Sequence, residues 1–168
     1  MTGTGLPNFD HAVQTANTWL IDVAKATGEE EDRHRAYRLL RAWLHTLRDR
    51  LPTDVAAHLG AQLPTLVRGV YYEGWDPHPT PVKFDRQEYL DRFGHEASLP
   101  AEDAGDIVRA VTAAVFLHIP PEQLEHVFDA LPKDLRSLVT PEAQESGVGA
   151  GDGGRHGPVP AGRGEAQR

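Results

Sequence analysis

Cysteine is absent from this chain of 168 residues. Disulfide frameworks, thiolate metal sites and cysteine nucleophiles are therefore excluded. The amino-terminal sequence lacks the basic region followed by an apolar run that marks a signal peptide. No stretch approaches the roughly 18 consecutive apolar residues of a membrane-spanning helix. These absences predict a soluble protein without a membrane partner, for which the cytoplasm is the default location.

Basic charge is also scarce, because 17 lysines and arginines face 25 acidic residues and give a net charge of -8. A nucleic-acid surface needs clustered basic residues to neutralise phosphates. The best local candidate, residues 32–41, carries its arginines on a predicted helix together with acids and is typical of a solvated face. We therefore expect no nucleic-acid partner.

Catalytic and metal-binding motifs are missing as well. There is no Gly-x-Ser-x-Gly elbow and no phosphate-binding loop. Residues 31–34 have the Glu-x-x-His spacing of di-iron bundles, but no second copy exists. His58 and His126 are expected to be separate boundary residues that do not converge on a metal. The sequence predicts no catalytic residue, no metal site and no cofactor.

The composition changes at Pro141. From there to Arg168 the chain is rich in glycine and has no Leu, Ile, Phe, Tyr or Trp. Such a segment buries too little apolar surface to offset the entropy lost on ordering. We predict a disordered tail at residues 141–168 and a single folded domain at residues 6–140.

Within that domain, apolar residues recur every three or four positions, which is the spacing of one helix face. The first predicted stripe comprises Phe9, Val13, Ala16, Leu20 and Val23. The second comprises Tyr37, Leu40, Leu44, Leu47 and Leu51. Both stripes are expected to lie in the core, and further segments of the same kind follow between prolines. The fold class predicted is an all-α helical bundle.

The helical pattern occurs twice. Residues 68 positions apart agree in type, as in the pairs Arg41/Arg109, Pro52/Pro120, His58/His126 and Pro64/Pro132. The entry motifs at residues 8–10 and 83–85 also agree, at an offset of 75. We predict two tandem repeats of three to four helices, at residues 8–73 and 84–139, with a joint at residues 71–83. Neither repeat has enough core to stand alone.

The joint holds the densest aromatic cluster of the chain, with Tyr71, Tyr72 and Trp75 beside Glu73 and His78. Large rigid aromatic bodies at a seam are expected to wedge between helix layers and fix the orientation of the two halves. The alternative is that these five residues bind a ligand in a pocket at the seam.

The same residues carry a family resemblance. The run from Leu51 to Pro77, with "LPKDLRSLV" closing the second repeat, resembles the bacterial family known as domain of unknown function 2267. The recognisable part is the Leu-Pro, Gln-Leu-Pro and Tyr-Tyr-Glu-Gly-Trp run, and the resemblance covers about residues 8 to 138. It implies an all-α fold of two repeats. It implies no activity, because the family has no assigned reaction.

Two functions remain open. The first is a non-enzymatic helical module that binds another protein or forms a homodimer, since stacked helical repeats offer extended surfaces to partners. The second is a small-molecule or metal binder with its pocket near residues 71–78. An enzyme is less favoured, because no nucleophile and base form a recognisable set.

Overall fold

The computed structural model describes residues 3–140, and α-helix is the only regular secondary structure in that range. Its eight helices are α1 (Pro7–Ala26), α2 (Arg33–Arg50), α3 (Thr53–Gln62), α4 (Thr65–Tyr72), α5 (Arg86–Ala97), α6 (Ala101–Phe116), α7 (Pro121–Asp129) and α8 (Lys133–Val139). The predicted all-α fold class is confirmed. The disorder predicted for residues 141–168 lies outside the described residues. No helix between residues 3 and 140 has the length and apolar character needed to cross a bilayer.

Prolines set the helix boundaries, as the sequence pattern indicates. Five helices begin directly after a proline N-cap, because proline cannot donate to the preceding helix but fits before the first turn of a new one. These prolines are Pro52, Pro64, Pro100, Pro120 and Pro132.

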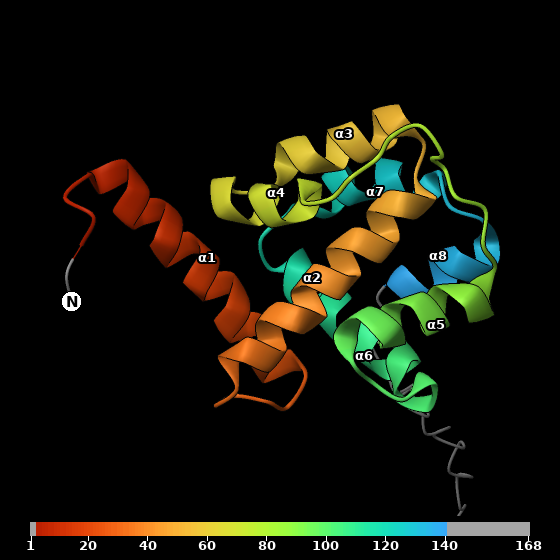
Figure 1. The fold of residues 1–168 in the computed structure, drawn as a ribbon, viewed down its shortest axis with the longest axis horizontal. Coiled ribbons are helices and arrows are strands. Elements are labelled where there is room, and N and C mark those ends of the chain that lie inside the picture. The colour runs from red at the N-terminus through yellow and green to blue at the C-terminus, as the bar shows by residue number, and fades with distance from the viewer. Residues whose placement is uncertain (1–2, 141–168) are drawn as a thin grey trace, which may run out of the picture.

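Helix α2 crosses the middle of the molecule and contacts α1, α4, α5 and α6 (Figure 1). The predicted stripe is buried from Leu40 to Leu51, but Tyr37 at its start is partly exposed. Burial extends beyond that stripe to Leu39 and Trp43. The indole nitrogen of Trp43 donates to the hydroxyl of Thr112 on α6 over 2.9 Å, which joins the two halves. Side chains from all eight helices form one continuous core.

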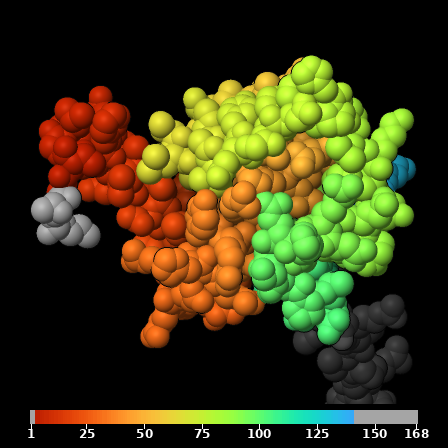
Figure 2. All heavy atoms as spheres, viewed as in Figure 1, coloured from red at the N-terminus to blue at the C-terminus, as the bar shows by residue number. Residues whose placement is uncertain are grey.

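Helix α1 is divided between the core and the solvent. Its second half carries the buried residues Trp19, Val23 and Ala24. Its first half stands out from the body (Figures 1 and 2), and Phe9 and Val13 are 60% and 45% exposed. The prediction that these two residues lie in the core is wrong. Their stripe has the correct helical spacing, but among residues 3–140 no element covers its amino-terminal part.

The helix contacts follow a regular scheme. When α1–α4 are exchanged for α5–α8, each extensively contacting pair maps onto another such pair, for example α1–α2 onto α5–α6 and α1–α6 onto α5–α2. The pairs α2–α6 and α3–α7 map onto themselves. The exchange is the one that a two-fold axis passing near α2–α6 and α3–α7 would produce.

Hydrogen bonds repeat in the same way. Arg68 of α4 donates to the carbonyl oxygens of Gly60 and Leu63, each over 2.9 Å. Arg136 of α8 donates to the carbonyl oxygens that lie 68 residues after those two. The division of residues 6–140 into two repeats stays a prediction, and these correspondences are what it leads one to expect.

Candidate functional site

The aromatic residues of the joint pack together. Tyr71 is fully buried, and its hydroxyl donates to the carbonyl oxygen of Ala56 over 2.6 Å. Burial raises the pKa of Tyr71 well above its ordinary value. The half-buried Tyr72 ring lies 4.9 Å from the Tyr71 ring and 5.3 Å from that of Trp75, measured between centroids. Tyr71 in particular has the environment of a structural residue, with its polar tip already satisfied.

The two polar residues predicted for the same site lie at the surface. The His78 side chain is 92% exposed and its Nδ1 lies 2.8 Å from Asp76 Oδ1. Hydrogen bonds from the backbone and side chain of His78 lower the pKa of Asp76. Glu73 is exposed, with its carboxylate 3.5 Å from Nε of Arg41. The structure thus brings the three aromatic rings together and leaves His78 beside Asp76 in solvent.

Below the joint, α2 contributes a buried histidine that the sequence analysis did not single out. His45 is 5% exposed, with Nδ1 2.7 Å from Glu96 Oε1 and Nε2 2.7 Å from the carbonyl oxygen of Val70. Both partners are hydrogen-bond acceptors. Both ring nitrogens of His45 therefore contact acceptor oxygens, one on α5 and one on α4.

A buried arginine, Arg48, lies three residues after His45 on α2. Arg48 donates through Nη1 to the carbonyl oxygens of Tyr71 over 2.6 Å and of Glu73 over 3.0 Å. The last carbonyls of a helix have no partner within it, and cations are favourable at that end. His45 and Arg48 therefore cap the carboxyl end of α4 and fix its position on α2.

Glu96 of α5 completes this polar cluster. Burial by itself would raise the pKa of Glu96, but the hydrogen bond from His45 and the charges of Arg41 and Arg48 outweigh it, so the pKa is lowered. Nη1 of Arg41 lies 2.7 Å from the same carboxylate oxygen. We call His45, Arg48 and Glu96 the α4 clamp, because they tie α4 to α2 and α5.

The histidines at matching repeat positions meet, contrary to expectation. The rings of His58 on α3 and His126 on α7 lie 5.2 Å apart between centroids and nearly perpendicular, and both residues are exposed. They converge because α3 and α7 pack directly on each other. Among residues 3–140, however, no group of three or more histidine or acidic side chains could hold a metal ion.

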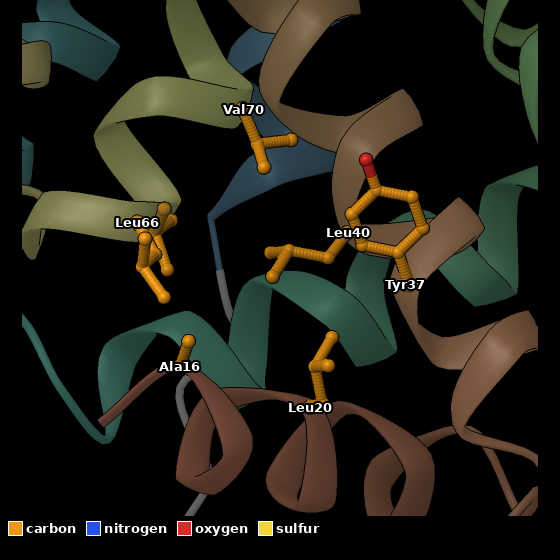
Figure 3. A pocket seen from close by; sticks show the side chains of 7 residues that line it. Ala16, Leu20, Tyr37, Leu40, Leu66 and Val70 are labelled. Atoms are coloured by element: carbon orange, nitrogen blue, oxygen red, sulfur yellow. The ribbon is translucent and has the colours of Figure 1, made fainter. Parts of the chain in front are cut away.

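An apolar groove lies between α1, α2 and α4, with a cavity volume of 320 Å³. Figure 3 shows its labelled side chains turned toward a common space: Ala16 and Leu20 from α1, Tyr37 and Leu40 from α2, and Leu66 and Val70 from α4. Val67 completes the lining, which contains no charged residue. The groove can bind an apolar surface but offers no acid, base or nucleophile.

Exposed apolar side chains extend the groove along the first half of α1. Leu6, Phe9 and Val13 continue the stripe that enters the groove at Ala16, and Leu66 on the facing helix is 44% exposed. Contiguous apolar surface of this kind commonly marks a binding site. Sequence reasoning identified the α1 stripe but assigned it to the core. None of the five residues proposed at the joint lines this groove.

The comparison with protein families identifies the chain. A family model described as "Uncharacterized conserved protein (DUF2267)" matches residues 16–138, which includes all eight helices except the first turns of α1 and the last residue of α8. A comparison with curated proteins gives no match. Since the family model covers most of the sequence, the resemblance carried by the Leu-Pro and Tyr-Tyr-Glu-Gly-Trp motifs is confirmed, and this chain belongs to the DUF2267 family.

Proposed function

We propose that the protein is a non-enzymatic helical module that binds an apolar helical segment of a protein in the groove between α1, α2 and α4. The observation that carries this proposal is the apolar surface that runs from Leu6, directly before α1, to Leu66 on α4. An amphipathic helix binds such a groove through residues spaced three and four apart on one face.

The surroundings of the groove support the same proposal. One of its walls, α4, is held by the α4 clamp and not by apolar packing alone. A wall fixed in this way keeps its shape when the groove is empty, which lowers the entropy lost on binding.

A small apolar molecule is the second candidate ligand, because a cavity of 320 Å³ falls at the lower end of the roughly 300–1,000 Å³ typical of ligand pockets. Such pockets usually add a few convergent polar groups that orient the ligand. The only polar atom of a lining side chain is the hydroxyl of Tyr37. The groove therefore suits a protein segment better.

Site-specific photo-crosslinking tests the proposal. A benzophenone amino acid placed at Leu66 should crosslink to a protein in living cells, and the product should disappear when Val13→Asp is added. The matched control places the same group at Leu117, which is 71% exposed and does not line the groove. Equal crosslinking at both positions, or a product unaffected by Val13→Asp, would contradict the proposal.

A further inference from the structure

We infer that the segment bound in the groove is α1 of a second copy of this chain, so that two copies form a symmetric dimer through antiparallel α1 helices. This inference rests on the proposed docking function and names the partner. Three observations lead to it: the lack of a counterpart to the first half of α1, the spacing of its apolar residues, and the fit of the α1 stripe to itself.

The first half of α1 has no counterpart in the second half of the protein. Buried residues of α1 and α5 correspond at an offset of 70: Trp19, Val23 and Ala24 match Tyr89, Phe93 and Gly94. At this offset the first residue of α5, Arg86, corresponds to Ala16. Residues 7–15 are therefore an extension of α1, and the family match also begins at residue 16.

The similar motifs at residues 8–10 and 83–85 do not occupy corresponding places in the two halves, because at the offset of 70 Phe84 corresponds to Gln14 and not to Phe9. Phe9 and Phe84 belong to the similar motifs at residues 8–10 and 83–85, yet Phe9 is 60% exposed and Phe84 only 4%. Phe84 contributes to the core of its half, whereas Phe9 contributes to no core in a single copy. The extension thus exposes the large aromatic side chain of Phe9 to solvent, where it packs into no core of the single copy.

The spacing on α1 is that of a helix that pairs with another helix. On one face of α1, beginning at its N-cap residue, apolar residues alternate by three and four positions: Leu6, Phe9, Val13, Ala16 and Leu20. This narrow stripe is the seam of a coiled coil, and it is narrower than the face that a helix usually turns to a globular core. In one copy, the end of the seam at residues 16–20 lines the groove, and the end at residues 6–13 is uncovered.

Two such seams fit each other when they run antiparallel. In an antiparallel pair, the sequence numbers of two facing residues add up to the same value along the helices. A value of 29 places Phe9 of one copy opposite Leu20 of the other, and Val13 opposite Ala16. The exposed ring thus meets the groove, and the branched valine meets the smallest side chain of the stripe. The two-fold axis passes between Gln14 and Thr15. Each copy places the exposed apolar residues of its α1 against the groove of the other copy. Because both grooves are then occupied, the assembly is a closed dimer.

Charge does not oppose this pairing. The extension at residues 7–15 carries a single acidic residue, Asp10, and no lysine or arginine. The net charge of -8 per copy is spread over the rest of the chain, and salt at physiological strength screens it beyond about 8 Å. The segment at residues 141–168 suits the groove less well, because it has no Leu, Ile, Phe, Tyr or Trp.

The area predicts a reversible dimer. The exposed apolar side chains of the groove and extension offer on the order of 400–500 Å² per copy, about half of the roughly 800 Å² that each partner buries in a standard interface. Flanking polar residues supply the remainder. Interfaces of small area are typical of weak, transient complexes, and we expect a Kd on the order of micromolar.

Sedimentation equilibrium tests the oligomeric state of the purified full chain. The wild type should be a dimer at ~100 µM and dissociate at ~1 µM or below. Phe9→Asp should remain a monomer at every concentration, with an unchanged circular dichroism spectrum, because Phe9 is not part of the core. Leu117→Asp, at an exposed leucine outside the groove, should dimerise like the wild type. A wild type that stays monomeric at ~200 µM overturns the inference.

Disulfide trapping tests the register of the two helices. Because the native sequence has no cysteine, only the introduced cysteines can form a disulfide. A mixture of Val13→Cys and Ala16→Cys proteins should form a crosslinked heterodimer on mild oxidation. The control mixture, His11→Cys with Thr18→Cys, has the same position sum but lies on the opposite face of α1 and should crosslink far less. Equal yields from the two mixtures would overturn the antiparallel register.

The outcomes separate this inference from the proposed function. A monomeric protein that still crosslinks to another polypeptide through position 66 rejects the second copy and keeps the docking function. A monomeric protein without a specific crosslink at position 66 rejects both.

Discussion

Replacing His45 with alanine should destabilise the protein by about 3 kcal/mol. Each hydrogen bond of a buried charged group contributes roughly 1.5–3 kcal/mol, and a buried acceptor left without a donor costs about 1–3 kcal/mol. His45 makes two such bonds of 2.7 Å, to Glu96 and to the carbonyl of Val70. Arg41 remains on Glu96 and water can reach part of the vacated space, so the loss should fall below the sum of these values.

Urea denaturation followed by circular dichroism measures this loss as a lower midpoint at an unchanged m-value. His78 provides a matched control, since its Nδ1 also lies within 2.8 Å of a carboxylate but its side chain is 92% exposed. His78→Ala should leave the midpoint unchanged, because exposed ion pairs contribute little.

A double-mutant cycle between His45→Ala and Glu96→Gln isolates their interaction, for which we expect a coupling free energy of at least about 1 kcal/mol. If the two histidine variants lost equal stability, or if the cycle gave no coupling, burial of the pair would not be the source of its energy. The account of the α4 clamp would then be refuted.

Three further predictions follow from the same physical reasoning. Tyr71→Phe should lower the unfolding free energy in urea by about 1–2 kcal/mol, whereas Tyr89→Phe should be neutral or stabilising, because the buried Tyr89 hydroxyl has no partner within residues 3–140. The pKa of Glu96 is lowered in the folded state, so the ionised carboxylate stabilises the fold fully above the unfolded pKa of 4.5, and this stabilisation is lost as the pH falls through the folded pKa. Glu96→Gln should therefore flatten the pH dependence of the melting temperature in that acidic range. An unchanged profile would contradict the assignment. Phe84→Ala should lower the free energy of unfolding by about 3–5 kcal/mol, whereas Phe9→Ala in the dilute monomer should lower it by less than about 0.5 kcal/mol. Similar losses for the two variants in urea titrations would show that Phe9 belongs to the core.

The helices could be predicted because their signals are local. Apolar spacing and proline punctuation depend on neighbours within one or two turns, so the sequence contains them directly. The starts of α3, α4, α7 and α8 after Pro52, Pro64, Pro120 and Pro132 are examples.

Whether an apolar stripe is covered depends instead on the rest of the fold. Phe9 and Leu20 belong to the same stripe with the same spacing, but only the latter lies beside α2 and α4. The sequence of α1 alone does not show which part of its apolar stripe is covered by the rest of the fold and which part extends beyond it. The groove was therefore missed, although the sequence analysis had placed all four of its lining residues on α1 and α2 in the predicted apolar stripes.

The α4 clamp was missed for a related reason. Histidine and arginine are mostly exposed in proteins, so nothing in the sequence marks His45 and Arg48 as buried residues. Their burial becomes favourable because the carboxyl end of α4 presents the carbonyl oxygens of Val70 and Tyr71 at that point. The partners are more than twenty residues away in the sequence, and the periodicity of α2 contains no information about them.

The most informative feature of the fold is where its two halves differ. Under the predicted correspondence, Val70 in the groove matches Leu138 in the second half, where the latter is fully buried and the former only half-buried. The leucine has the larger side chain of the two. The first half has a smaller valine at that position and an extended α1, so its groove remains open. The helix contacts of the two halves match, but the apolar groove lies in the first half, and closing it would bury more apolar surface. The open half is therefore the place where we propose that a partner adds apolar contacts.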